Sequence, residues 1–507
     1  MSIVNVNGTV ALFFANFLSK VFGAIYRIPL SNFLGTEGMG LYQMAFPIYS
    51  FLLTIITGGI SITLTRKVAS SRAKGDKEQV QKDFIIAKRM SFLLGIILFL
   101  CLCAFSYPLA LLQGNTSAIY GYAGISLGFV FACMLGAYRG YYQGFGNMLP
   151  TAISQVLEQM IKLILGLTFA SILVKFGIIY GVLGAVLGVS VSELICFLYF
   201  VILNRKLPKF KVTINRGEYR LFFKQVVPVS ISYGILPMSS LIDSFLIINL
   251  LTLSGFLTAT ATSLYGLETG MILPLINMPN VLISAIAITA IPELTYKQSK
   301  GEDLSKSVSK MFKLAYIFIL PCAVGLFLLS KQILGLIYPA LTGEVLEVAV
   351  VLLKLSIFEM FFLCFVTISN SILQAVGKTK VPIYSLLVGM ATKILLTLVF
   401  VTNAKLNIYG LVLASSVGYF TSALINLVQI KKQAKFSLRL LEVIAPIIAC
   451  LVMSLFILAY LKFITNYTMI GIITIVLISV VAYFGILWAL KLISIKELKN
   501  MLQNSTK

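Results

Sequence analysis

Residues 90–112 read MSFLLGIILFLCLCAFSYPLALL, an apolar run without one charged side chain. A helix needs about 20 predominantly apolar residues to cross about 30 Å of hydrocarbon, so this stretch is long enough to span a bilayer. The chain contains fourteen such segments. They are residues 6–30, 41–64, 90–112, 119–138, 152–174, 180–203, 226–250, 267–291, 312–329, 345–375, 382–401, 408–430, 443–461 and 469–490. The pattern predicts an all-α polytopic membrane protein, with residues 252–265 left as a loop.

The composition excludes a water-soluble enzyme. Of the 507 residues, 59% are hydrophobic and 11% are charged, whereas an average soluble domain is about 45–50% apolar and about 25% charged. The chain has no His, which removes His-based catalytic triads and His metal sites. Its seven Cys lie in apolar runs without a Cys-x-x-Cys pair, so neither a zinc site nor a disulfide framework is indicated. There is also no phosphate-binding loop of the Gly-x-x-x-x-Gly-Lys-Ser/Thr type. We therefore expect no catalytic site, no metal and no cofactor.

The charge pattern predicts how the chain lies in the membrane. The formal charge is +23, and most of the 40 basic residues lie in the loops after even-numbered spans and in the C-terminal tail. The loops after odd-numbered spans hold only Lys175, Lys331, Lys405 and Lys462. Basic residues favour the cytoplasmic side, so both termini are predicted to be cytoplasmic. The basic loops lack interleaved aromatic residues, and we expect contact with the bilayer and not with a nucleic acid.

The chain repeats a motif, which predicts a duplicated fold. A Gln, a Gly, a Pro and an intramembrane Lys recur in the same order in both halves, with the Gln, Gly and Lys at equal spacing. The two sets are Gln143, Gly146, Pro150 and Lys162, then Gln374, Gly377, Pro382 and Lys393. An offset of six spans, an even number, makes the repeats parallel. We expect an N-terminal six-helix lobe (residues 1–215), a C-terminal six-helix lobe (216–435), and a helix pair with a cytoplasmic tail (436–507).

The first span carries its polar residues on one face. Asn16, Lys20, Gly23 and Arg27 follow one another at steps of four, three and four residues, and the span contains no acidic residue. Intramembrane charges are costly and generally face the interior of the bundle, so Asn16, Lys20 and Arg27 are candidates for binding an anion. Lys393, which has no acidic residue in the preceding turn, is another. The alternatives are ion pairs with acids on other helices, or snorkelling of Arg27 to the membrane surface.

Lys162 is also a candidate for binding the anion, but it follows Glu158 by four residues. This is the favourable order for an ion pair within one helix, so a structural pair is the alternative.

The remaining intramembrane acids are candidates for ion coupling or charge pairing. Asp243 follows Pro237 and neighbours several serines, and a broken helix with a carboxylate and hydroxyl groups can hold Na⁺ or a proton. Glu268 and Glu193 are comparable candidates for protonation. Each of the three could instead pair with Lys20 or Arg27.

The segment joining the first two spans resembles a known family. Its motifs are Ser19-Lys20-Val21-Phe22-Gly23, Tyr26-Arg27-Ile28-Pro29 and Gly40-Leu41-Tyr42-Gln43. They resemble the stage V sporulation protein B family, in the polysaccharide-transport branch of the multidrug/oligosaccharidyl-lipid/polysaccharide (MOP) exporter superfamily, alongside MurJ-type lipid II flippases. Lys20 matches the basic position of the Ser-Arg-Val-Leu-Gly motif of MurJ-type proteins. Arg27 lies one residue beyond their second arginine in this helix.

The resemblance implies a flippase in the bacterial plasma membrane. Its substrate would be an undecaprenyl-pyrophosphate-linked cell-envelope sugar, such as the peptidoglycan precursor lipid II or a polysaccharide unit, moved from the inner to the outer leaflet by alternating access. It also implies a groove for the lipid tail at residues 443–490. MurJ-type arginines in the second and eighth spans are missing here, where the eighth span carries Glu268, so the sugar stays open. The alternatives are a cation-coupled multidrug exporter of the same superfamily, or a membrane protein that assists envelope-synthesis enzymes.

Overall fold

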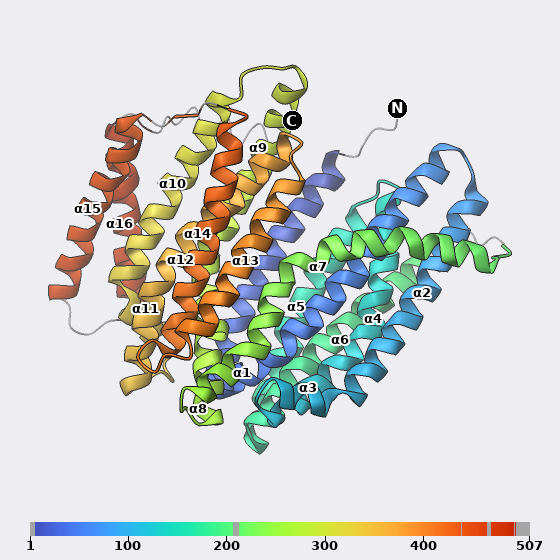
Figure 1. Ribbon diagram of the computed structural model, residues 1–507, viewed down its shortest axis with the longest axis horizontal. Helices are drawn as coiled ribbons and strands as arrows, with labels where there is room; N and C mark the ends of the chain where they lie inside the picture. Colours follow the sequence, from blue (N-terminus) through green and yellow to red (C-terminus); the bar gives the residue numbers. More distant parts are fainter. Residues whose placement is uncertain are drawn as a thin grey trace. The chain divides into compact units, whose positions relative to one another are not determined.

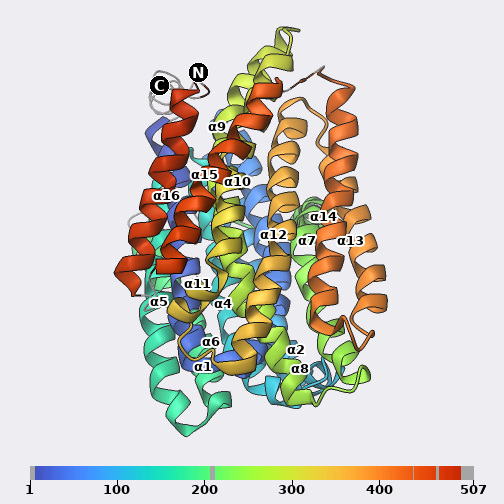
Figure 2. The same cartoon turned by 90° about the vertical axis from the view of Figure 1, so that its left-hand side faces the viewer.

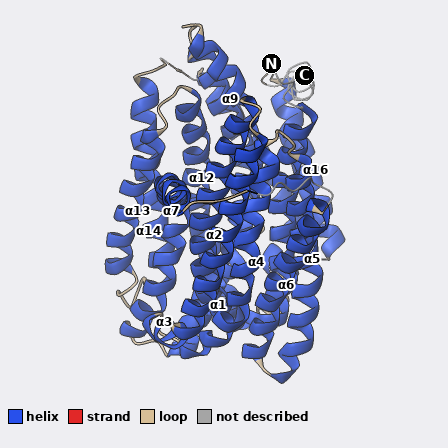
Figure 3. Cartoon of the chain, turned by 90° about the vertical axis from the view of Figure 1, so that its right-hand side faces the viewer, coloured by secondary structure: helices blue, strands red, loops and turns tan. Residues whose placement is uncertain are grey.

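The computed structural model contains helices and turns in the part of the chain that it describes, without a β-strand there (Figure 3). The described residues are 6–205, 212–434, 436–437, 439–463, 468–490 and 492. The helices are α1 (Val6–Ala73), α2 (Lys77–Ala104), α3 (Ser106–Leu112), η1 (Thr116–Ala118), α4 (Ile119–Gly144), α5 (Leu149–Leu173), η2 (Val174–Phe176), α6 (Ile178–Asn204), α7 (Arg216–Leu253), α8 (Thr258–Gly266), η3 (Leu267–Ile272), α9 (Leu273–Ser299), α10 (Ser305–Leu328), α11 (Ser330–Ile337), α12 (Gly343–Ala375), α13 (Lys380–Phe400), α14 (Asn407–Lys431), α15 (Leu440–Phe463) and α16 (Met469–Ala489). The predicted all-α polytopic class is confirmed.

Twelve of these helical stretches are long and apolar enough to cross a membrane, or thirteen if α7 is included as one bent span. Each of the fourteen predicted spans overlaps one of them, because α1 contains the first two. The predicted span at 90–112 runs past the end of α2 at Ala104 and into α3. Helix α1 consists of a first arm (residues 6–34) and a second arm (residues 36–73). The two arms meet at Gly35, which has φ 66° and ψ −172°. A positive φ is readily available to glycine alone, so this residue breaks the helix without a loop. Figure 1 draws α1 running along the bundle and returning.

Two other regions depart from straight predicted spans. Helix α7 bends by 59° between Ile235 and Pro237, as expected where proline removes a helical hydrogen bond. The prediction of a loop at residues 252–265 is wrong for its second half, because α8 begins at Thr258. This stretch is rich in Thr, Ala and Ser, so its hydropathy is low, yet its small side chains allow close helix packing.

Tertiary contacts divide the chain into two compact units, Met1–Met271 and Ile272–Lys507. The division falls inside η3, a single π-helical stretch between α8 and α9. Helices α7 and α8 therefore pack with the first unit, although the repeat assigns them to the second lobe. The three-part division that the repeat indicates, into residues 1–215, 216–435 and 436–507, stays a prediction.

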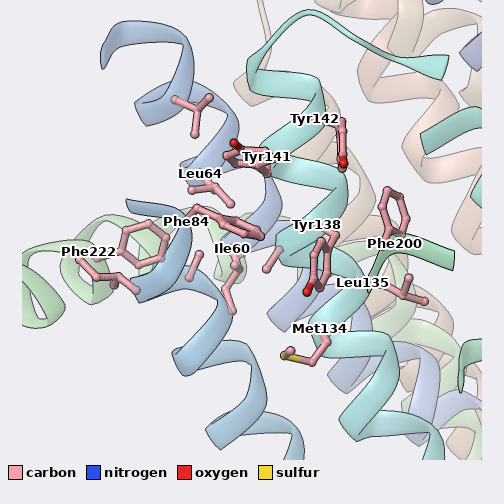
Figure 4. Close-up of a cluster of buried hydrophobic side chains, with 14 of the residues drawn as sticks. Ile60, Leu64, Phe84, Met134, Leu135, Tyr138, Tyr141, Tyr142, Phe200 and Phe222 are labelled. Atoms are coloured by element: carbon pink, nitrogen blue, oxygen red, sulfur yellow. The ribbon is translucent and has the colours of Figure 1, made fainter. Parts of the chain in front are cut away.

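The first unit is held together by an aromatic core where α1, α2, α4, α6 and α7 meet (Figure 4). The ring of Phe84 lies 4.3 Å from that of Tyr141 and 5.4 Å from that of Tyr138, between ring centroids. Tyr138 in turn stacks on Phe200 at 5.7 Å. Such ring pairs add stabilisation beyond the apolar area that they bury, so this core fixes α4 against its neighbours.

A second contact in this unit joins the second arm of α1 to α8. The two backbones touch where Gly40 faces Gly266: a Cβ built on Gly266 would lie 2.3 Å from the Gly40 nitrogen. Next to it, Gln43 Nε2 donates to the Thr269 carbonyl at 2.6 Å, and the Tyr265 hydroxyl donates to the Gln43 carbonyl at 3.1 Å. The second arm of α1 and α8 therefore form one closely packed pair.

The second unit is built around α12, which packs against α9, α10 and α14, while α13 packs on α14. Helices α15 and α16 form a pair beside α10 (Figure 2). The pair is anchored by Tyr483, which is fully buried and donates from its hydroxyl to the Ile317 carbonyl at 2.8 Å.

Candidate functional site

The first arm of α1 carries two cations that form no ion pair with a described residue. Lys20 and Asn16 are exposed, and Arg27 is half-buried. The ion pairs formed by described residues include neither Lys20 nor Arg27. Charged side chains inside a membrane protein are normally paired or line a functional cavity, so both remain candidates for binding an anion.

Lys162 on α5 also forms no ion pair with a described residue. Its Nζ sits 5.1 Å from the centre of the Tyr26 ring and 4.8 Å from that of Phe46. Both rings belong to α1, so cation–π attraction holds the ammonium group against that helix. The pair with Glu158 that the i, i+4 spacing indicates does not form.

Glu158 is bound instead by Arg139 of α4. Arg139 NH2 lies 2.7 Å from Glu158 Oε2, and Arg139 Nε donates to Ser154 Oγ at 3.0 Å. The fork of the guanidinium group thus reaches two positions on α5 that are one turn apart, which a lysine could not match. Sequence reasoning missed Arg139, because it placed this residue just outside the span ending at 138, whereas α4 continues to Gly144.

Arg27 and Lys162 lie within electrostatic range of each other, and Glu158 and Glu193 also lie within range of Lys162. We call Arg27 and Lys162 the cation pair. Two neighbouring cations repel each other in a poorly solvated setting, and an anion placed between them would relieve that repulsion. The α5 face that meets the first arm of α1 is polar here, since a Cβ built on Gly23 would lie 3.9 Å from Gln159 Oε1.

Glu193 on α6 is the most enclosed acid of this region, with 4% of its surface exposed. The Tyr49 hydroxyl donates to its Oε1 at 3.2 Å. Its Oε2 is buried and receives no hydrogen bond from a described residue. A buried carboxylate oxygen without a donor is costly when ionised. Glu193 therefore remains a candidate for protonation.

Asp243 and Glu268 both lie in the first unit, and each has an interaction partner of its own. Asp243 lies within electrostatic range of Tyr265 on α8. Its neighbour Ser244 accepts a hydrogen bond from Gln113 Nε2 at 2.9 Å. Glu268 is 3% exposed in η3. Their roles in ion coupling stay predictions.

Lys393 lies in the second unit on α13, where its Cβ would be 2.9 Å from one built on Gly418 of α14. It has an interaction partner of its own, and its participation in anion binding stays a prediction. Within the described residues, no group of three or more Cys, Asp or Glu side chains could hold a metal ion.

The chain matches the sequence model of a known family, the polysaccharide biosynthesis proteins, over residues 6–296. It belongs to this family. A second model, MatE, matches residues 228–399 of this polysaccharide biosynthesis protein. Both matched families belong to the MOP superfamily, which the motifs of the first two spans predict.

The curated relatives of this family member include a flippase. It is 25% identical over 466 residues to "Lipid II flippase MurJ" of Bacillus subtilis (strain 168), covering 87% of this chain and 85% of that protein. It is also 25% identical over 475 residues to "Stage V sporulation protein B" of the same organism, covering 90% of each. The resemblance seen in the first two spans thus extends along the chain.

Solved structures share its fold. A lipid II flippase MurJ in an inward closed conformation aligns with a TM-score of 0.72 at 17% identity, covering 94% of this chain and 97% of that one. An inward-facing multidrug resistance MATE family transporter of the MOP superfamily aligns with a TM-score of 0.65 at 16% identity, covering 84% and 97%. The chain is a multi-pass membrane transporter of the MOP superfamily, similar to flippases, and not an enzyme.

Proposed function

We propose that this transporter flips lipid-linked sugars of the bacterial cell envelope from the inner to the outer leaflet of the plasma membrane. The observation that carries the proposal is the cation pair, Arg27 and Lys162: neither forms an ion pair with a described residue, in a chain related to a lipid II flippase. A pyrophosphate group is an anion that can neutralise two neighbouring cations. A multidrug exporter for cations would have less use for them.

In the proposed cycle, the sugar-pyrophosphate headgroup enters from the cytoplasm and contacts Arg27 and Lys162, with Lys20 and Asn16 assisting. The polyprenyl tail stays in the lipid while the lobes rock to open outward. Both termini are cytoplasmic. Moving one charge through the membrane potential is worth about 2.3 kcal/mol per 100 mV. Two negative charges leaving a negative interior would gain roughly twice that, so the potential can drive export. Exchange of H⁺ or Na⁺ at Asp243, Glu268 or Glu193 would add to it.

Flipping is tested in liposomes that contain the protein and a fluorescent undecaprenyl-pyrophosphate-linked sugar. A membrane-impermeant quencher then measures which leaflet holds the label, with and without an imposed potassium diffusion potential. We expect flipping that accelerates with an inside-negative potential and falls at least tenfold in Arg27→Gln and Lys162→Gln. The control is Lys331→Gln, which removes an exposed lysine paired with Glu347 at 2.6 Å and should leave the rate unchanged. Full activity in both cation-pair variants would refute the proposal.

A second candidate function is export of organic cations coupled to an ion gradient. The MatE match over residues 228–399 and the MATE-like fold favour it. Transport of a cationic dye by the same liposomes, insensitive to Arg27→Gln, together with no movement of the lipid-linked sugar, would support this function instead.

A further inference from the structure

The first step concerns which cation Glu158 binds. Residues four apart on a helix are neighbours, about 5–6 Å between Cβ atoms, so Lys162 could reach Glu158 by a change of rotamer. The structure instead pairs Glu158 with Arg139 at 2.7 Å, and both side chains are about four-fifths shielded, with 20% and 18% exposed. One acid thus has two cations within reach, and Arg139 holds it.

Arg139 is held in this position from α5 itself. Its Nε bonds to Ser154 Oγ, and Ser154 is fully buried and also donates to the Thr151 carbonyl at 2.7 Å. Glu158 has a further donor in Gln159 Nε2 at 3.3 Å. These contacts engage both oxygens of the Glu158 carboxylate.

Lys162 is consequently available on the opposite side, against Tyr26 and Phe46 of α1. Cation–π contacts of this kind hold a lysine without forming an ion pair. The other nearby acid, Glu193, is engaged by Tyr49. The position of Lys162 therefore depends on Glu158 staying with Arg139.

We propose that Arg139 is a positioning residue for anion binding, which keeps Lys162 free for the substrate's pyrophosphate by occupying Glu158. The inference rests on the proposed function and deepens it, since Arg139 need not touch the substrate. Removing the guanidinium group leaves Glu158 as a shielded carboxylate without its cation, a costly arrangement. Lys162, one turn away, then turns to Glu158 and is lost to the anion.

The test measures binding of farnesyl pyrophosphate, used as the probe, to the full-length protein in detergent by isothermal titration calorimetry. With Lys162 drawn to Glu158, Arg139→Gln should weaken binding at least about tenfold, which corresponds to about 1.4 kcal/mol. The double variant Arg139→Gln with Glu158→Gln removes both charges, frees Lys162 again, and should bind within about threefold of the unaltered protein. A merely structural role of Arg139 would not be rescued by a second substitution at its partner.

A matched control breaks another shielded ion pair of the same unit. Lys67 Nζ contacts Asp83 Oδ1 at 2.6 Å, and the Asp83 side chain is fully buried. Lys67→Gln should lower the thermal unfolding midpoint but leave probe binding unchanged. Loss of binding in Lys67→Gln equal to that in Arg139→Gln would mean that any damage to the unit weakens binding, which overturns the inference.

The remaining outcomes separate the two proposals. If Arg27→Gln and Lys162→Gln bind the probe as well as the unaltered protein, the proposed function is overturned. If these two variants lose binding while Arg139→Gln keeps it, or if the double variant is not rescued, the positioning role of Arg139 is overturned and the proposed function stands.

Discussion

Replacing Gly266 with alanine should drive α8 away from the second arm of α1. The added Cβ would lie 2.0 Å from the Thr36 carbonyl oxygen and 2.3 Å from the Gly40 nitrogen, against 3.4–4 Å for an ordinary contact. Both obstacles are backbone atoms, which cannot rotate aside. The helices therefore have to separate by at least about 1 Å, and such overpacking costs about 1–3 kcal/mol.

The displacement also reaches the neighbouring hydrogen bonds. The Tyr265 hydroxyl lies 3.1 Å from the Gln43 carbonyl, so a shift of about 1 Å would break the bond, at about 1 kcal/mol. We expect a loss of about 2–4 kcal/mol in total, the sum of these two terms.

The assay heats purified protein in detergent and measures the folded fraction that elutes as a sharp peak in size-exclusion chromatography. Gly266→Ala should lower the midpoint by several degrees. The control is Gly325→Ala on α10, where an added Cβ meets nothing within 4 Å. There the better helix propensity of alanine, worth up to about 1 kcal/mol, should leave the midpoint unchanged or slightly raised. Equal midpoints for Gly266→Ala and the unaltered protein would contradict the close packing of α8 on α1.

Two further predictions concern single contacts. Ser126 Oγ lies 3.4 Å from Cys103 Sγ, so Ser126→Cys should form a disulfide between α2 and α4 on mild oxidation. Mass spectrometry would detect the bond as a loss of two hydrogens. If both thiols stay free after oxidation, the two helices are not packed as the structure has them. Tyr483→Phe removes the buried hydroxyl that donates to the Ile317 carbonyl at 2.8 Å. The loss of this hydrogen bond should cost about 1 kcal/mol or more and lower the thermal unfolding midpoint. An unchanged midpoint would show that α16 is held by packing alone.

The membrane spans could be predicted because each one carries its own signal, a long apolar run. The span pattern fails at α8, where Thr, Ala and Ser replace bulky apolar residues. The backbone of α8 packs against Gly40, and no local pattern of residues encodes a partner so distant in the sequence.

Part of the candidate site could likewise be predicted from local sequence, and part could not. The spacing of Lys20 and Arg27 places them on one helix face, and the structure leaves both without an acidic partner among the described residues. The pairing of Glu158 was not predictable, because local spacing favours Lys162 while the packing of α4 on α5 delivers Arg139. Competition between a near and a distant cation is decided by tertiary structure.

The break at Gly35 has a mechanical consequence for the whole first unit. One residue with a left-handed backbone joins the two arms of α1, so there is no slack between them. The first arm carries Arg27 and rests on α5, while the second rests on α4, α7 and α8 through contacts such as that of Gly40. Adding one residue at the joint would turn the second arm by about 100° and advance it by about 1.5 Å. A tilt of the first arm, which carries Arg27, should therefore displace the second arm as well.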